Sequence, residues 1–209
     1  MRISTFAHLA REVLARPARL GEVRLVAVDG PTGSGKSTFA RRLAAALGDT
    51  ATRLCTDDLL DGWADTVTFW PRLEEHVLSP ILAGRDGAYR RYDWTAGRFT
   101  DETTLVPAGG VLLVDGVTSA RRAARPLLTL AVWMDVPFEA SLARAIARDG
   151  PAAAGELRAW HERERAHFAE DGTAAHADLL VDGAPTVPHD ADREFVVRRP
   201  PGTAGCTHD

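Results

Sequence analysis

Apolar residues in this chain fall into short continuous runs and into longer stretches with helical spacing. The short runs predict buried strands, and apolar residues that recur every three or four positions predict helices. Because the two kinds of segment alternate, we expect an α/β fold with a mostly parallel sheet. The predicted strands cover residues 23–28, 52–55, 111–114, 127–134 and 178–181, and the predicted helices cover residues 5–16, 37–47, 70–82, 137–148 and 155–170.

Two parts of the chain lack this periodicity. Residues 84–107 follow no clear pattern, and an unstructured stretch of that length in a compact domain is typically functional or disordered. From residue 183 onward, Pro, Gly, Thr, Asp and His dominate. We therefore predict a single domain over 1–183 and a C-terminal tail over 184–209, frayed from residue 198.

Composition excludes several classes of protein. The chain has 209 residues, 45% of them hydrophobic and 26% charged, which is typical of one globular domain. A net charge of −4 argues against a nucleic-acid partner, and two cysteines are too few for a disulfide framework or a four-ligand zinc site. No apolar run approaches the roughly 18 residues of a membrane span, and the N-terminus lacks the apolar core of a secretory signal. We expect a soluble, cytoplasmic protein without a membrane partner, and we leave a homo-oligomer open.

One segment carries a phosphate-binding pattern. Residues 30–37 read Gly-Pro-Thr-Gly-Ser-Gly-Lys-Ser, which fits G-x-x-x-x-G-K-[ST], the Walker A pattern. The segment follows a predicted strand and opens a predicted helix, so its backbone N–H groups and the helix N-terminus can bind phosphate oxygens. In this pattern the lysine reaches the β- and γ-phosphates and the serine hydroxyl joins Mg²⁺. The predicted ATP-binding residues are Gly30, Pro31, Thr32, Gly33, Ser34, Gly35, Lys36, Ser37 and Thr38.

The lysine count favours ATP as the nucleotide. Lys36 is the single lysine among the 25 Lys and Arg residues. A guanine-specific GTPase normally reads its base with an Asn-Lys-x-Asp segment, which this chain cannot contain. Lys36 itself is a compact ammonium, which an arginine does not replace where phosphate oxygens must be reached.

Acidic residues follow two predicted strands. Asp57 and Asp58 come after one strand, and Asp115 follows another. In an open parallel sheet the carboxyl ends of the strands meet in the crevice where ligands bind. A carboxylate there can accept the proton of an attacking hydroxyl or hold magnesium, directly or through water. The alternative for Asp57 or Asp58 is that it caps the next helix or turn.

Several segments, taken in order with the Walker A pattern, resemble the uridine kinase family of P-loop kinases. The resemblance spans about residues 23–183. It implies a P-loop kinase fold with a five-stranded parallel sheet, flanking helices and a small, mobile helical lid at about 149–171. It also implies transfer of the ATP γ-phosphate to a hydroxyl of a small acceptor. The segments are Asp-Asp-Leu-Leu at 57–60, Tyr-Asp-Trp at 92–94, Val-Leu-Leu-Val-Asp-Gly at 111–116, Arg-Ala-Ile-Ala-Arg-Asp at 144–149 and Ala-Asp-Leu-Leu-Val-Asp-Gly at 177–183.

The resemblance implies a role for each matched residue. The general base falls on Asp57, and Arg148 and Arg144 fall at the base of the lid near the phosphates. The resulting predictions are catalytic Asp57, Lys36 and Arg148, ATP-binding Arg144, acceptor-binding Asp58, Tyr92, Asp93 and Arg98, and metal-binding Ser37 and Asp115.

Three departures from the family keep other functions open. Asp115 stands where a glutamate is usual, Gly97 stands where the family has a base-reading histidine, and residues 150–155 replace an arginine-rich lid segment. A nucleoside such as uridine or cytidine is the first acceptor to consider. Another alcohol (a sugar, a pantothenate-like compound or an antibiotic precursor) is an alternative. A P-loop ATPase or regulatory nucleotide-binding module that acts without an acceptor is the alternative from a different class.

Weaker signals have ordinary structural explanations. Trp63, Trp70 and Trp94 could stack on a base, although aromatic residues usually lie in the core. The predicted helix 155–170 has Leu157, Trp160, Glu164 and Phe168 along one face. The histidines at 161, 167 and 176, with nearby glutamates, match no metal-ligand spacing and predict a polar helix face. The arginines at 121, 122 and 125 predict a solvated helix face.

Overall fold

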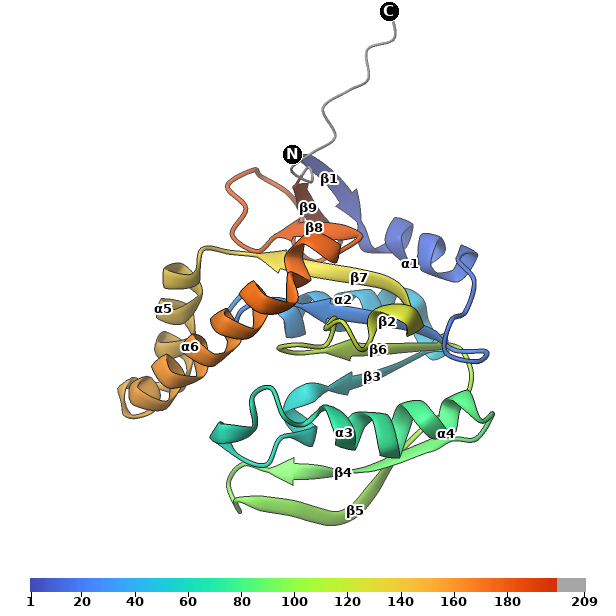
Figure 1. Ribbon diagram of the computed structural model, residues 1–209. Helices are drawn as coiled ribbons and strands as arrows, with labels where there is room; N and C mark the ends of the chain where they lie inside the picture. The colour runs from blue at the N-terminus through green and yellow to red at the C-terminus, as the bar shows by residue number, and fades with distance from the viewer. Residues whose placement is uncertain (199–209) are drawn as a thin grey trace, which may run out of the picture.

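Five parallel strands form the centre of the fold: β2 (Arg24–Asp29), β3 (Ala51–Cys55), β6 (Val111–Asp115), β7 (Leu128–Asp135) and β8 (Leu179–Asp182). The structure is a computed structural model that describes residues 1–198. The five strands lie in the order β8–β7–β2–β6–β3, and each pair of neighbours is parallel (Figure 1). The predicted parallel sheet is confirmed.

Two more strands make this a seven-stranded sheet. β9 (Glu194–Arg198) pairs antiparallel with β8, and β1 (Arg2–Thr5) pairs antiparallel with β9 at the edge. Phe195 of β9 is buried, and its ring lies 5.1 Å from those of Phe6 and Phe39. The expectation of a tail from residue 184 is therefore corrected, because the short apolar run in β9 is long enough to extend a sheet. The frayed end predicted beyond Arg198 lies outside the described residues.

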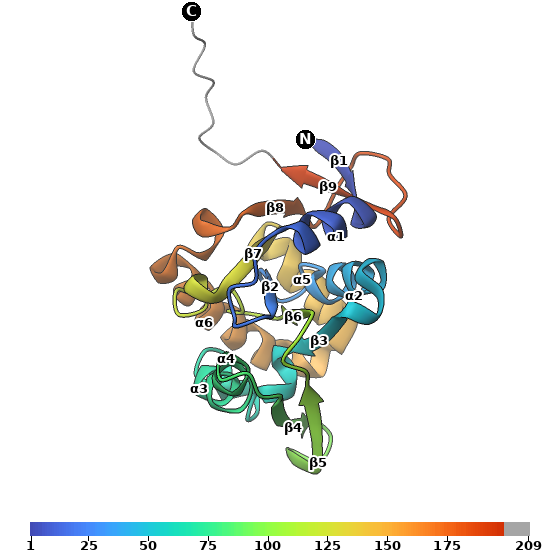
Figure 2. The same ribbon diagram turned by 90° about the vertical axis from the view of Figure 1, so that its right-hand side faces the viewer.

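Helices cover both faces of the main sheet (Figure 2). α1 (Phe6–Ala15) and α2 (Lys36–Leu47) lie on one face, and α6 (Ala154–Asp171) lies on the other, next to α5 (Phe138–Asp149). Alternate residues of β2 divide between two apolar clusters, with Val26 and Val28 in one and Leu25 and Ala27 in the other. A strand buried on both faces reads as a continuous apolar run, which explains why the sequence predicted β2 so clearly.

The predicted helix 70–82 is a continuous helical segment with a wide turn in its middle. It consists of α3 (Trp70–Leu73), a π-helical turn (Glu74–Leu78) and α4 (Ser79–Leu82). The N–H of Ser79 donates to the carbonyl of Glu74, five residues earlier. Pro80 follows directly and has no N–H to donate into the helix. The wide turn is thus next to the proline that the pattern identified as a disturbance.

Residues 84–107 form a β-hairpin rather than an unstructured loop. β4 (Gly87–Asp93) and β5 (Arg98–Val106) pair antiparallel in a separate two-stranded sheet that lies beyond β3 and α3 in Figure 1. Tyr89 and Val106 are buried, whereas most other positions are polar and at least partly exposed. With so few buried positions, the hairpin shows little hydrophobic alternation, and the expectation of no regular structure was wrong.

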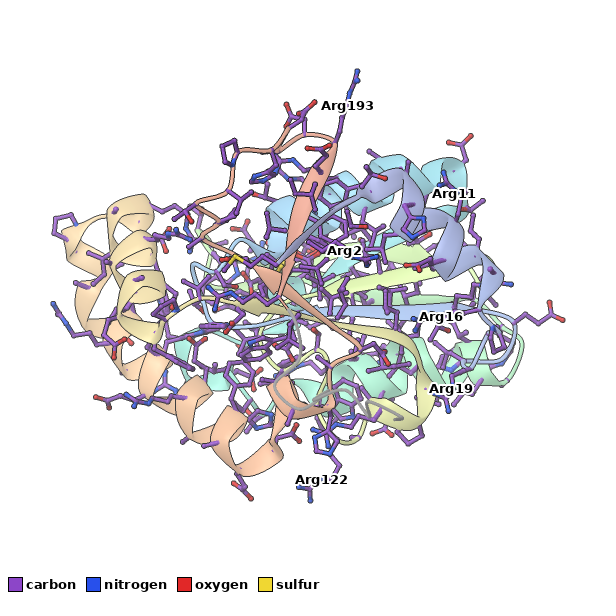
Figure 3. The ribbon with its side chains drawn as sticks, turned by 90° about the horizontal axis from the view of Figure 1, so that it is seen from above. Arg2, Arg11, Arg16, Arg19, Arg122 and Arg193 are labelled. Atoms are coloured by element: carbon purple, nitrogen blue, oxygen red, sulfur yellow. The ribbon has the colours of Figure 1, made fainter. Side chains whose placement is uncertain are left out.

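The arginines at 121–125 are also less solvated than expected. Arg122 is exposed and points away from the protein in Figure 3, as does Arg193. The guanidinium of Arg121 instead lies over the rings of Phe69 and Trp70, 5.4 and 5.3 Å from their centroids. Arg125 forms an ion pair with Asp171 at the end of α6. The sequence pattern does not reveal either partner because they lie about 50 residues away.

Short 3₁₀ turns connect the larger elements, and two of them carry residues of the site described below. They are η1 (Gly48–Thr50), η2 (Thr56–Leu59), η3 (Trp63–Asp65), η5 (Arg125–Leu127), η6 (Pro151–Ala153) and η7 (Thr173–His176). Among residues 1–198, no helix combines the length and apolar character that crossing a membrane requires.

Candidate functional site

The phosphate-binding pattern forms a loop between β2 and α2. Gly33 and Gly35 adopt φ angles of +83° and +96°, which side chains rarely tolerate. A Cβ at Gly33 would lie 2.2 Å from the carbonyl oxygen of Ser141, so glycine allows the loop to pack directly on α5. Lys36 and Ser37 form the first turn of α2, where the backbone N–H groups have no acceptor within the helix. Such a loop and helix end bind anions.

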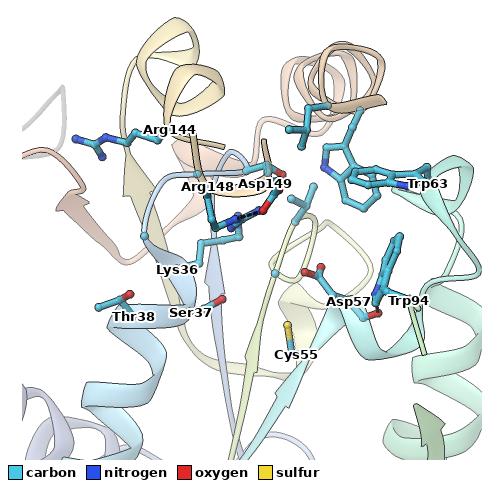
Figure 4. Close-up of a pocket in the computed structure, with 17 residues that line it drawn as sticks. Lys36, Ser37, Thr38, Cys55, Asp57, Trp63, Trp94, Arg144, Arg148 and Asp149 are labelled. Carbon is cyan, nitrogen blue, oxygen red and sulfur yellow. Dashed lines mark hydrogen bonds and ion pairs between the residues drawn. The ribbon is translucent and has the colours of Figure 1, made fainter. Parts of the chain in front are cut away.

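Lys36 folds back over this loop. Its ammonium donates to the carbonyl oxygens of Gly30 and Pro31, at 2.8 and 3.0 Å. The side chain lines a cleft of about 540 Å³ at the carboxyl ends of β2, β3 and β6. Figure 4 shows Lys36, Ser37 and Thr38 on one side of this cleft and Asp57, Trp63 and Trp94 on the other. The other lining residues are Thr32, Gly33, Gly35, Cys55, Gly116, Val117, Arg144, Arg148, Asp149, Leu157 and Trp160.

Asp57 presents its carboxylate to the cleft from η2. The surrounding protein removes water from the carboxylate and raises its pKa, and the negative charge of Asp115 adds to this effect. The positive charges of Lys36 and Arg148 act in the opposite direction. The Asp57 side chain is exposed to the cleft and faces the phosphate loop across it (Figure 4).

Arg144 and Arg148 reach the site from α5. Nε and Nη2 of Arg148 donate to the two carboxylate oxygens of Asp149, at 2.6 and 2.7 Å, and both residues line the cleft (Figure 4). Arg144 donates to the carbonyl oxygen of Gly183 at 2.8 Å and also lines the cleft. The structure thus brings the predicted phosphate-side arginines to the same cavity as Lys36.

Asp58 does not share the position of Asp57. Its carboxylate accepts from the hydroxyl of Tyr89 at 3.3 Å and from Nη2 of Arg91 at 3.2 Å, both on β4. It fixes η2 to the hairpin and is not among the residues that line the cleft within the described chain. Two adjacent acids therefore have different environments, which their sequence alone does not distinguish.

The other predicted acceptor residues lie on the hairpin behind the cleft wall. Asp93 accepts from the N–H groups of Thr95 and Ala96 at 2.9 Å and stabilises the β4–β5 turn. Arg98 is exposed, with a guanidinium nitrogen 3.9 Å from Asp101. Tyr92 packs its ring on Trp94, at a centroid distance of 5.2 Å. In the described part of the chain these three residues stand outside the cleft lining.

Tryptophan side chains form the wall that faces the phosphate loop. The rings of Trp63 and Trp94 are 5.4 Å apart, and those of Trp63 and Trp160 are 5.8 Å apart, both edge to face. Trp94 donates from Nε1 to the carbonyl oxygen of Asp57 at 3.2 Å and remains 40% exposed. Trp70, by contrast, is buried beneath Arg121. Cys55 lies on the cleft floor, where burial raises the pKa of its thiol and keeps it uncharged.

The residues predicted to hold magnesium fit that role unequally. The Ser37 hydroxyl lies in the cleft beside the phosphate loop, and an oxygen ligand there suits Mg²⁺, which keeps several waters and binds nucleotide phosphates. Asp115 is fully buried, and both of its oxygens accept from Arg53, at 2.6 and 2.8 Å. Among residues 1–198, no group of three or more His, Cys, Asp or Glu side chains is arranged to hold a metal ion. Ser37 therefore fits a magnesium ion bound to ATP, whereas the Asp115 carboxylate is paired with Arg53.

Sequence analysis did not identify Asp29 as a site residue. Its fully buried carboxylate accepts from the N–H groups of Gly30, Thr118 and Ala120, at 2.7, 2.9 and 2.8 Å. Burial raises its pKa to about 6, although these donors and Lys36 oppose the shift. Asp29 thereby joins the phosphate loop to the segment after β6, where Thr118 has a φ of +66°. The sequence did offer one indication of this role, because Asp29 directly precedes Gly30, the first residue of the phosphate-binding segment.

Glu164 and His161 of α6 were predicted on a polar helix face, and this was wrong. Both side chains are buried against the phosphate loop. Glu164 accepts hydrogen bonds from Thr32, and His161 lies within hydrogen-bonding distance of the Thr32 carbonyl oxygen. The signal was present in the sequence, because Glu164 lies on the same helix face as Leu157, Trp160 and Phe168.

Comparisons with known proteins identify the fold. No protein-family model and no curated protein sequence matches the chain. A solved structure described as a possible uridine kinase from Bacillus stearothermophilus aligns with a TM-score of 0.63 and 17% identity, over 84% of this chain and 96% of that one. The D-glycerate 3-kinase of Cryptococcus neoformans var. grubii aligns with a TM-score of 0.54 and 12% identity, over 88% and 97% of the two chains. The predicted P-loop kinase fold is confirmed.

Proposed function

We propose that this protein is an ATP-dependent kinase that transfers the γ-phosphate of ATP to a hydroxyl of a small acceptor. The observation that carries the proposal is the arrangement around one cleft. The phosphate loop with Lys36 lies on one side, and the basic carboxylate of Asp57 faces it from the other, beside a wall of tryptophans. Neighbours of the same fold include proteins described as kinases with alcohol acceptors, which agrees with this chemistry.

The phosphate side of the cleft stabilises the transferring group. Lys36 and the N–H groups at the start of α2 bind the phosphate oxygens of ATP. The Ser37 hydroxyl would hold a magnesium ion bound to ATP, and that ion would supply positive charge to offset the charge of the phosphates. Arg148 donates to Asp149 through two of its three nitrogens, and within residues 1–198 the third has no hydrogen-bond partner, so it can contact a phosphate oxygen. Catalysis of phosphoryl transfer depends mainly on such positioning and charge.

Asp57 activates the acceptor. It accepts the proton of the attacking hydroxyl as the oxygen approaches the γ-phosphate, and a raised pKa makes it the more effective base. Asp58 accepts hydrogen bonds from Tyr89 and Arg91 and so holds η2 in place, and we assign it no contact with the acceptor. We assign the proton transfer to Asp57 alone of this pair.

The tryptophan wall favours an acceptor with a flat apolar face. The exposed ring of Trp94 and the neighbouring ring of Trp63 offer surfaces on which a base can stack, as aromatic side chains do for nucleobases. A nucleoside of the uridine or cytidine type combines such a face with a primary hydroxyl. We infer that a nucleoside is the preferred acceptor.

A different alcohol is the second candidate, and Gly97 is the observation that favours it. Gly97 has a φ of +65° in the β4–β5 turn, and it offers no side chain at this position to form hydrogen bonds with a base. The glycerate kinase neighbour has the same fold and is named for a non-nucleoside acceptor. A P-loop ATPase without an acceptor would make no use of the tryptophan wall.

A panel of acceptors tests the proposal. ADP release is measured with ATP, magnesium and either uridine, cytidine, a sugar, glycerate, pantothenate or no acceptor. Stimulation by a nucleoside supports the proposal, and stimulation by another alcohol alone supports the second candidate. ADP release at the same rate with and without every acceptor would show that the protein is an ATPase.

A further inference from the structure

Helix α6 places a buried carboxylate directly on the phosphate loop. Glu164 is fully buried, and both of its oxygens accept from the backbone N–H of Thr32, at 3.0 and 3.1 Å. The Thr32 hydroxyl donates to Oε2 at 2.9 Å. Thr32 is the third residue of the phosphate-binding segment and lines the cleft. One side chain of α6 thus accepts every hydrogen bond that Thr32 donates in this structure.

His161 completes the contact one turn earlier on the same helix. Its Nε2 lies 3.2 Å from the carbonyl oxygen of Thr32 and 3.2 Å from Oε1 of Glu164. A carbonyl and a carboxylate oxygen only accept hydrogen bonds, so the proton of the neutral ring belongs on Nε2. The backbone N–H, the backbone carbonyl and the hydroxyl of Thr32 are therefore all bonded by α6.

A purely structural contact does not require a carboxylate here. Burying a carboxylate is costly, and apolar side chains pack helices without that cost. The position of this carboxylate determines the direction of the Thr32 N–H, which lies in a loop whose N–H groups bind phosphate. The cost of burying this carboxylate is therefore explained by the need to orient Thr32 in the phosphate loop, and not by the packing of α6.

We propose that Glu164 is a positioning residue for nucleotide binding, which holds Thr32 and thereby fixes the phosphate loop to helix α6. This proposal rests on the proposed binding of ATP, but it does not depend on which acceptor the protein uses.

Isothermal titration with ATP and magnesium, without acceptor, tests the proposal. We expect Glu164→Gln to weaken ATP binding about tenfold, because one of the two oxygens that accept from Thr32 is replaced by an NH2 group that cannot accept, and the loop is held less firmly. Glu162→Gln is the matched control, since Glu162 is exposed on the same helix. The control should bind ATP as the unmodified protein does.

The double variant separates positioning from general destabilisation. Thr32→Val removes the hydroxyl donor, and in the Thr32→Val background the Glu164→Gln change should weaken ATP binding by a smaller factor than it does alone. All affinities are measured at a temperature at which circular dichroism shows each variant to be folded. If Glu164→Gln does not fold, Thr32→Val alone must still weaken ATP binding.

Three results would overturn the proposal. Unchanged ATP affinity in Glu164→Gln would show that the contact does not position the loop. Tighter binding would show that the carboxylate repels the phosphates, and independent effects of the two substitutions would show that Glu164 does not act through Thr32. ATP binding that depends on Glu164 in a protein without acceptor-stimulated turnover would refute the kinase but leave this proposal intact.

Discussion

The pH dependence of stability should change when Glu164 is replaced by glutamine. Burial raises the pKa of the Glu164 carboxyl to about 7 from an ordinary value of 4.5, although Lys36 and Thr32 oppose the shift. The folded protein therefore holds this proton over a pH range in which the unfolded chain has lost it. The contribution of Glu164 to folding stability is then greatest below pH 4.5, and it falls as the pH rises toward and through 7.

The size of this effect follows from the two pKa values. Between pH 5 and pH 8, ionisation of Glu164 costs the folded state about 2–3 kcal/mol, since each pKa unit corresponds to about 1.4 kcal/mol. Glutamine cannot ionise, so the unfolding free energy of Glu164→Gln should gain about 2–3 kcal/mol relative to that of the unmodified protein over the same range. Any constant loss from the altered hydrogen bonds to Thr32 cancels in this comparison.

Urea denaturation, followed by tryptophan fluorescence at pH 5, 6, 7 and 8, measures the difference. Glu162→Gln should show the same pH dependence as the unmodified protein, because the Glu162 side chain is exposed. Parallel stability curves for Glu164→Gln and the unmodified protein would refute the reasoning. They would mean that the buried carboxylate ionises as readily as an exposed one.

Further predictions concern the cleft. Lys36→Ala should lower turnover about 10²–10³-fold in steady-state kinetics. Lys36→Arg should be impaired as well, because a planar guanidinium does not replace the compact ammonium that donates to the carbonyl oxygens of Gly30 and Pro31. Asp57→Asn should lower kcat about 10²–10⁴-fold with little change in the ATP Kd. Asp58→Asn should mainly lower the stability of the protein, and a larger loss of kcat in Asp58→Asn than in Asp57→Asn would reverse the two roles. Trp94→Ala should raise the KM of a nucleoside acceptor about tenfold and leave the ATP KM unchanged, whereas an equal rise in both would show that the ring does not contact the acceptor.

The sequence predicted the central sheet because its strands are buried on both faces. Continuous apolar runs such as Val111–Val114 leave little choice of structure, and the glycines and Lys36 identify the loop that follows β2. The β4–β5 hairpin and β9 were missed for the opposite reason. Their exposed faces are polar and their buried residues are few, so long-range pairing with other strands decides their structure.

Asp115 illustrates what position in the sequence cannot show. It is the last residue of β6, and the prediction that it binds magnesium rests on that position. The side chain of Arg53, on the neighbouring strand β3, donates to both of its oxygens. Such a pairing depends on strand order and side-chain direction, which the sequence does not reveal for two residues 62 positions apart.

Lys36 joins the separate parts of the site through its charge. Burial raises the pKa of Asp29, Asp57 and Glu164, and the positive charge of Lys36 acts against this rise in all three. These three acids come from β2, η2 and α6. A bound phosphate would compete with them for the same ammonium. Arginine serves at every other basic position in the chain, but a compact cation is required where three acids and a phosphate share one charge. The folded structure thus adds a reason for lysine at position 36 that the sequence does not show, namely the three buried acids around its ammonium.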